Sequence, residues 1–272
     1  MTFSQWLFGG INNPYKAGQW GPLHIGTLVV CVALIVGFYH IVKHASNREK
    51  AKRCIAFALV GAIAFFEVMI RFVYCVKLYH LHLPEMTGVT WYYIALPRPW
   101  CAVSCWALMA SVFIKKPFFY NFAALSALLC SFIFFCYPGV GYNNEILLFE
   151  NWYSILTHAL LLTTSITFMV LKYTDFKYAH LWKTGIAFAL TFVYALIQVF
   201  VLKVHVDPMY FMPNGDIQAD ILHMDYGLYL VLYIFLLLTY VNTAYMLGDK
   251  QTVAAFFGKV KGVAARCKKT NG

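Results

Sequence analysis

The sequence predicts an all-α, polytopic membrane protein in which seven transmembrane helices form one bundle. Hydrophobic residues make up 61% of the 272 residues and charged residues only 12%, with a mean hydropathy of +0.66. Soluble proteins are roughly half apolar and about a quarter charged, so this composition excludes a soluble enzyme. Apolar runs of about 20 residues recur along the chain, and that length crosses ~30 Å of hydrocarbon. The runs lack the polar and apolar alternation of an outer-membrane barrel.

Seven runs are long and apolar enough to be transmembrane helices. Backbone groups in lipid must form hydrogen bonds within their own segment, so each run is expected to be helical. The connections are short, which indicates antiparallel neighbours in one bundle and leaves no room for a second, soluble domain. In chain order the predicted spans are His24–Lys43, Arg53–Tyr79, Tyr92–Ile114, Phe118–Val140, Glu150–Tyr173, Trp182–Val204 and Tyr226–Leu247.

The distribution of charge predicts the orientation of these spans. Lys and Arg follow spans one, three, five and seven, whereas Glu and Asp dominate the connections after spans two, four and six. Because basic loops stay in the cytoplasm, the N-terminus is predicted outside and the C-terminus inside. Residues 1–23 lack the features of a signal peptide and form an extracellular segment, residues 24–248 the transmembrane domain and residues 249–272 a basic cytoplasmic tail. The protein is expected in a plasma or bacterial inner membrane.

The basic residues also predict the partners. The net charge of +10 lies mostly at the ends of apolar runs, where it faces lipid headgroups, so membrane lipids are expected partners and nucleic acid is not. In the tail, Val253, Phe256, Phe257 and Val260 recur at helical spacing, which favours an amphipathic helix on anionic inner-leaflet lipids; a merely solvated tail explains the pattern equally well.

The eight cysteines form no spaced CxxC pairs, so neither a disulfide framework nor a metal site is predicted, and no cofactor is expected.

Polar residues inside apolar runs are candidate functional residues, because an ionisable group in a span costs several kcal/mol. Counted at ~1.5 Å per residue, the candidates fall at similar depths in the outer half of the bundle, which is typical of a cavity open to the outside. They are His24 in span one, Glu67 and Arg71 in span two, Arg98 and Cys101 in span three, His158 in span five and Gln198 in span six.

Each candidate also has a structural interpretation. Glu67 and Arg71 are four residues apart on one helix face and could simply neutralise each other. Arg98 lies between two prolines, either in a broken helix beside a cavity or just outside a span that starts at Pro99. His158 could serve only as a hydrogen-bond donor between helices, and Cys101 could be an ordinary core residue.

The order of these residues resembles the YwaF-like family of bacterial integral membrane proteins, whose distant eukaryotic relatives include a transmembrane acyltransferase. The resemblance covers nearly the whole chain, with one departure, since the family tends to carry a histidine where Pro99 stands. The basic loop before Glu67 and Arg71 belongs to it, and the other landmarks are Gly21-Pro22-Leu23-His24, Leu96-Pro97 before Cys101, Tyr137-Pro138-Gly139, His158 and Tyr210-Phe211-Met212-Pro213.

The resemblance implies lipid acyl chemistry in an outward-facing cavity. Cys101 would attack an acyl ester, His158 would take its proton, and Arg98 or Arg71 would hold a phosphate headgroup. A second hypothesis from the residues themselves is a transporter or receptor-like binder, in which the same side chains hold a small or anionic solute without covalent chemistry. A third is a haem or metal site built from His24 and His158.

Overall fold

A computed structural model describes residues 7, 20–82, 91–136, 149–203, 209–213, 222–252 and 254, and these residues are helical with no strands. Within these ranges, six helices are long and apolar enough to cross a membrane. They are α2 (Pro22–His44), α3 (Arg48–Tyr79), α6 (Pro117–Cys136), α7 (Phe149–Val170), the helical stretch of α8 (Leu181–Leu196) and α9 (Tyr226–Gly248). The chain therefore has the architecture of a multi-pass membrane protein.

The predicted third span is divided into two helices. A short helix, α4 (Trp91–Ala95), is separated by Leu96–Pro99 from α5 (Trp100–Ile114), which alone is shorter than a full span. Proline removes a backbone donor and disfavours helical geometry in the residue before it, so Pro97 and Pro99 interrupt the helix. The predicted span over Tyr92–Ile114 therefore contains a break at Arg98, and a broken helix was one of the two interpretations of the prolines around this residue.

Local signals account for several helix ends. Asn47 caps α3, since its side chain accepts a hydrogen bond from the Lys50 amide at 2.9 Å, and Asp225 caps α9 in the same way. Pro22 begins α2 and Pro117 begins α6, the helix position that proline favours. α3 therefore starts five residues before the predicted Arg53, because hydropathy detects the hydrocarbon-facing part of a helix rather than its cap.

The later helices also differ from the predicted spans at their ends. α7 ends at Val170 and not at Tyr173, while α8 continues as a π-helical turn over Ile197–Val201. Within the described residues α6 ends at Cys136, so the predicted continuation to Val140 lies outside them. Most of the predicted extracellular segment and of the basic tail also lies outside the described residues.

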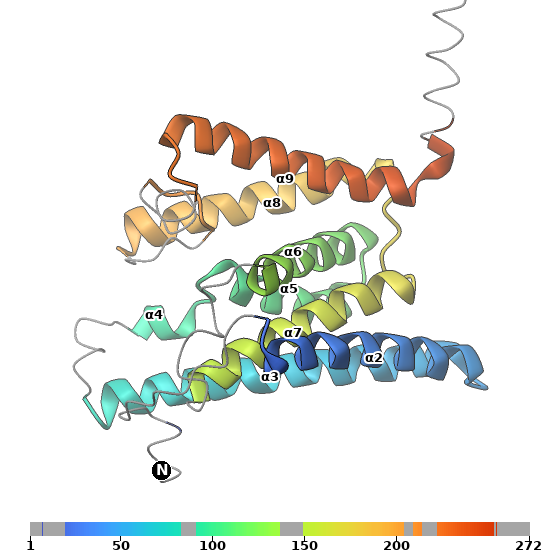
Figure 1. Cartoon of the computed structure of the whole chain (residues 1–272), viewed down its shortest axis with the longest axis horizontal. Coiled ribbons are helices and arrows are strands. Elements are labelled where there is room, and N and C mark those ends of the chain that lie inside the picture. The colour runs from blue at the N-terminus through green and yellow to red at the C-terminus, as the bar shows by residue number, and fades with distance from the viewer. Residues whose placement is uncertain are drawn as a thin grey trace, which may run out of the picture.

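The helices lie along one common direction, and the chain alternates between the two ends of the bundle (Figure 1). α6 is central, with twelve of its twenty residues buried, and it packs against α5, α7 and α8. α2 and α3 pack against α7 on one side, and α8 and α9 lie on the other. α2 and α9 each bury only three residues, so their apolar surfaces face outward, as expected for helices in contact with lipid.

Hydrogen bonds between side chains join α5 to the central helix. The Trp100 indole donates to Ser126 Oγ at 2.6 Å, and Ser104 Oγ lies 2.7 Å from the same atom. Small hydroxyl residues allow close approach of helices in a membrane and supply bonds that lipid cannot. These contacts fix α5 and thereby the start of that helix, where Cys101 lies.

The two ends of the bundle differ in chemistry. The end with the turns 45–47, 115–116 and 171–177, here called the basic end, carries the lysines and arginines that follow α2, α5 and α7. At the opposite end, here called the site end, α3 finishes and α5 and α7 begin (Figure 1). The candidate residues of the sequence gather near the site end.

Candidate functional site

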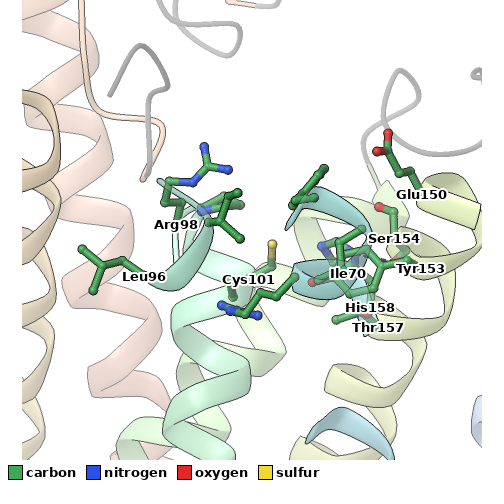
Figure 2. Close-up of a pocket in the computed structure, with 14 residues that line it drawn as sticks. Ile70, Leu96, Arg98, Cys101, Glu150, Tyr153, Ser154, Thr157 and His158 are labelled. Carbon is green, nitrogen blue, oxygen red and sulfur yellow. Dashed lines mark hydrogen bonds between the residues drawn. The ribbon is translucent and has the colours of Figure 1, made fainter. Parts of the chain in front are cut away.

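A cavity of about 240 Å³ opens at the site end between α3, α5 and α7. Four residues singled out in the sequence line it, namely Arg71, Arg98, Cys101 and His158. Figure 2 shows Cys101 between the Arg98 side of the cavity and the α7 residues around His158. The remaining lining residues are Ile70, Tyr74, Ile94, Leu96, Pro99, Ala102, Glu150, Tyr153, Ser154 and Thr157.

The helix break places Arg98 and Cys101 at this cavity. In a continuous helix the Pro97 carbonyl would accept a bond from the amide four residues later. Here it accepts instead from Tyr194 Oη at 3.0 Å and from Gln198 Nε2 at 3.1 Å, both on the α8 side. A backbone carbonyl outside a helix at membrane depth needs such hydrogen-bond donors, because lipid provides none. Cys101 is thus the second residue of α5, directly after the break.

The ring of His158 has a defined orientation and tautomer. Its Nδ1 lies 2.7 Å from the Ser154 carbonyl oxygen, and its ring stacks on Phe134 with centroids 3.8 Å apart. A carbonyl oxygen only accepts hydrogen bonds, so Nδ1 carries a proton and, in the neutral ring, Nε2 holds the lone pair. That is the tautomer a general base needs.

Glu67 is a buried carboxylate whose hydrogen bonds are made by protein side chains. It accepts from Arg71 Nη1 at 2.7 Å, from Tyr153 Oη at 2.7 Å and from Trp106 Nε1 at 3.0 Å. Arg71 also donates to the Ala95 carbonyl at 3.4 Å and lies over the Trp106 ring. Glu67 itself does not line the cavity, and it holds Arg71, which does.

A second ion pair lies at the edge of the cavity. Lys77 Nζ, on α3, lies 2.6 Å from Glu150 Oε1 at the start of α7, and the lysine side chain is only 7% exposed. A charge removed from water needs a partner of opposite charge. This pair therefore joins the end of α3 to the start of α7 and sets the position of the α7 face that carries His158.

The remaining two predicted site residues lie away from the cavity lining. His24 is buried against Trp20 and Phe135, and its Nδ1 accepts a bond from the Trp20 amide at 3.0 Å. Gln198 is buried beside the helix break and acts on the site through the Pro97 carbonyl. Among the described residues, no three His, Cys, Asp or Glu side chains are grouped as metal ligands would be.

Sequence reasoning missed several residues of this site. Tyr153 and Trp106 complete the Glu67 hydrogen bonds, and Lys77 pairs with Glu150, which the sequence placed at the start of the fifth span but not in the site. One signal was present, because Glu150, Tyr153, Ser154, Thr157 and His158 recur at helical spacing and form one polar face of α7. Trp106 and Lys77 have no comparable pattern, and only the packing of α3 against α5 and α7 identifies them.

The fold and the cavity define the class of this protein as an all-helical, multi-pass membrane protein with a polar, arginine-containing cavity near one end of the bundle. Comparison with protein-family models, with curated proteins and with solved structures finds no match to this chain. The function therefore has to be inferred from the chemistry of the cavity.

Proposed function

We propose that this protein is a membrane enzyme that cleaves or transfers the acyl group of an anionic lipid ester at Cys101 and His158. One observation carries the proposal, namely that a thiol from α5 and an imidazole from α7 line the same cavity as two guanidinium groups. A nucleophile, a base in the required tautomer and a phosphate-binding cation are the parts that acyl transfer needs. The resemblance to the YwaF-like family, with its acyltransferase relative, points to the same chemistry.

The reaction proceeds through a thioester on Cys101. His158 Nε2 takes the thiol proton while Sγ attacks the ester carbonyl carbon. The ester C–O bond breaks, and the leaving alkoxide receives that proton, which gives a lysolipid and an acylated cysteine. Water or an acceptor alcohol then attacks the thioester carbon and gives its proton to His158. Sγ leaves and recovers the proton, so the enzyme is restored with a fatty acid or a new ester as product.

The dimensions and charge of the cavity favour a headgroup in it rather than a whole lipid. Its volume of about 240 Å³ lies below the roughly 300–1,000 Å³ of pockets that enclose complete ligands. A phosphate and the nearby ester would occupy it, and the acyl chains would lie in the surrounding hydrocarbon. Arg98 and Arg71 would hold the phosphate through the planar, multidentate contacts that guanidinium forms.

The proposed topology places this cavity at the outer face of the membrane. We propose seven crossings, with α4 and α5 together forming the third, the N-terminus outside and the C-terminus inside a plasma or bacterial inner membrane. The basic end would then contact the anionic inner leaflet, as positive-inside segments do, together with the tail.

A second candidate is reversible binding or transport of a small anionic solute. The small volume of the cavity favours it, as does the buried Thr157 hydroxyl, which has no hydrogen-bond partner among the described residues. In this case the same arginines would bind the solute, and Cys101 would form no covalent bond.

An acyl-transfer assay distinguishes the two candidates. Purified protein would be given phosphatidylglycerol with a fluorescent acyl chain, and released fatty acid and acylated protein would be measured. Cys101→Ala should abolish both, and His158→Ala should slow turnover by roughly 10²–10⁴-fold. Cys54→Ala is the matched control, because Cys54 is exposed near the basic end. Full activity of Cys101→Ala would reject the enzyme, and solute binding without ester cleavage would support the second candidate.

A further inference from the structure

A groove of about 510 Å³ lies between α8 and α9. Its lining residues differ from those of the cavity that contains Cys101. Apart from Asn242 its walls are apolar and aromatic, and they include Trp182, Gly185, Phe188, Phe192, Leu237 and Val241. α8 and α9 lie alongside each other in Figure 1. The groove therefore runs along the two helices on the side of the bundle opposite α2 and α3.

Tyrosine hydroxyls, together with packed apolar side chains, hold α9 to the rest of the protein. Tyr240 Oη donates to the Leu125 carbonyl at 2.9 Å, and Tyr233 Oη donates to the Met209 carbonyl at 2.9 Å. At the basic end, the Tyr245 hydroxyl bonds to Asn121 and Thr184. The first two bonds attach α9 to α6 and to the segment at Met209, whereas Tyr245 attaches it to both α6 and α8.

The length of the groove matches one leaflet of a bilayer. Its α8 wall extends from Leu181 to Phe192, and eleven residues rise about 17 Å in an α-helix. Half of the ~30 Å hydrocarbon core is about 15 Å. An acyl chain that starts at the headgroup level would therefore fill the groove and end near the bilayer centre.

A positive charge beside the basic end of the groove indicates which kind of headgroup it would bind. Lys183 lies in the first turn of α8, next to the groove residue Trp182. Its Nζ is 5.4 Å from the ring centroid of Trp182 and 5.9 Å from that of Phe118 on α6. Within the described ranges, no carboxylate forms an ion pair with Lys183. Trp182 is 62% exposed at the same level, as aromatic residues at a membrane interface are. An ammonium group at this position favours a phospholipid whose whole headgroup carries a net negative charge.

We infer that the α8–α9 groove binds one acyl chain of an anionic glycerophospholipid from the leaflet at the basic end, with Lys183 beside its headgroup. The site is separate from the proposed acyl chemistry, so it holds whether or not Cys101 is catalytic. The bound lipid completes the packing between α8 and α9 that the protein's own side chains leave open.

Native mass spectrometry of delipidated protein in detergent tests the site. Dioleoylphosphatidylglycerol and dioleoylphosphatidylcholine would be titrated separately. The wild type should bind one lipid with about fivefold preference for the anionic one, the ratio expected from one lysine at a membrane surface. Lys183→Gln should reduce this preference to about one. An unchanged preference in this variant would contradict the assignment of the headgroup.

A variant whose new side chain fills the groove provides a second test of the site. A Cβ at Gly185 meets nothing within 4 Å, so Gly185→Leu should fold and occupy the groove. Gly61 on α3 is equally open but lies outside the groove, and Gly61→Leu is the matched control. We expect Gly185→Leu alone to weaken binding of both lipids by tenfold or more. Unaltered lipid binding would overturn the site, and loss of a dimer in this variant would show that a second copy fills the groove.

Discussion

At the scale of single residues, Glu67 shows how a carboxylate can be buried at membrane depth. Three donors from α3, α5 and α7 converge on its two oxygens, which compensates for the lost water. The sequence predicted the Glu67–Arg71 pair from its spacing of four residues, and the pair forms with a 2.7 Å contact. The two donors from other helices could not be predicted, because helix rotation is not encoded in spacing alone.

Removal of Arg71 should therefore destabilise the protein more than removal of the whole pair. Arg71→Gln leaves the Glu67 charge buried without its cation, and we expect a loss of about 3 kcal/mol in the free energy of unfolding. Glu67→Gln combined with Arg71→Gln should recover part of that loss, because no uncompensated charge remains. Unfolding in detergent micelles measures both variants. A double variant less stable than Arg71→Gln would contradict this account.

Asp175, in the turn after α7, should make stability depend on pH. Burial opposes its ionisation, but hydrogen bonds from His180, Asn121 and the Lys177 amide outweigh that effect and hold the pKa of this carboxyl below its usual value. A folded-state pKa below the unfolded value of about 3.9 stabilises the protein above that pH. The contribution is lost as pH falls through the folded-state pKa.

Thermal unfolding between about pH 6 and pH 3 tests this prediction. The wild type should lose stability below about pH 4, and Asp175→Asn should flatten that part of the profile while lowering stability at neutral pH. An unchanged profile in Asp175→Asn would assign the acid sensitivity to other carboxylates.

At the scale of elements, the break between α4 and α5 depends on α8. Tyr194 and Gln198 donate to the Pro97 carbonyl that the helix itself leaves free. The combined variant Tyr194→Phe with Gln198→Leu should cost about 1–2 kcal/mol of stability. The segment between α4 and α5 would then open more often. In a background without the other cysteines, Cys101 should therefore react faster with a thiol reagent than it does in the parent protein. Equal labelling rates would show that the break is held by other contacts.

The attachment of α9 by tyrosines predicts a selective effect of hydroxyl removal. Tyr245→Phe deletes bonds to Asn121 and Thr184 and leaves both buried groups with fewer partners, so we expect a loss of about 1 kcal/mol. Tyr39→Phe on α2 is the control, since that side chain is 44% exposed. Unfolding of both variants in micelles provides the measurement, and an equal effect would contradict the role of Tyr245.

At the scale of the whole molecule, the proposed orientation predicts which loops reach the outside. In a cysteine-free background, an impermeant maleimide added to intact cells should label His82→Cys, beyond α3 at the site end. It should not label Ser46→Cys, in the turn after α2 at the basic end. Both should react after the membrane is opened. Labelling of Ser46→Cys alone would reverse the proposed orientation.

The sequence by itself predicted an all-helical, multi-pass membrane protein with seven spans, and six of these spans are long apolar helices in the described residues. It also offered a helix break near Arg98 as one of two interpretations. Each depends on local properties, namely the length of an apolar run, which matches the bilayer, and proline, which removes a backbone donor. Only the tertiary structure decided that Cys101, His158, Arg71 and Arg98 line one cavity while His24 and Gln198 lie elsewhere. The rotation of each helix and its contacts with other helices depend on the packing of side chains far apart in the chain. Hydropathy indicates how deep a residue lies in the membrane, but not which neighbouring helix it faces.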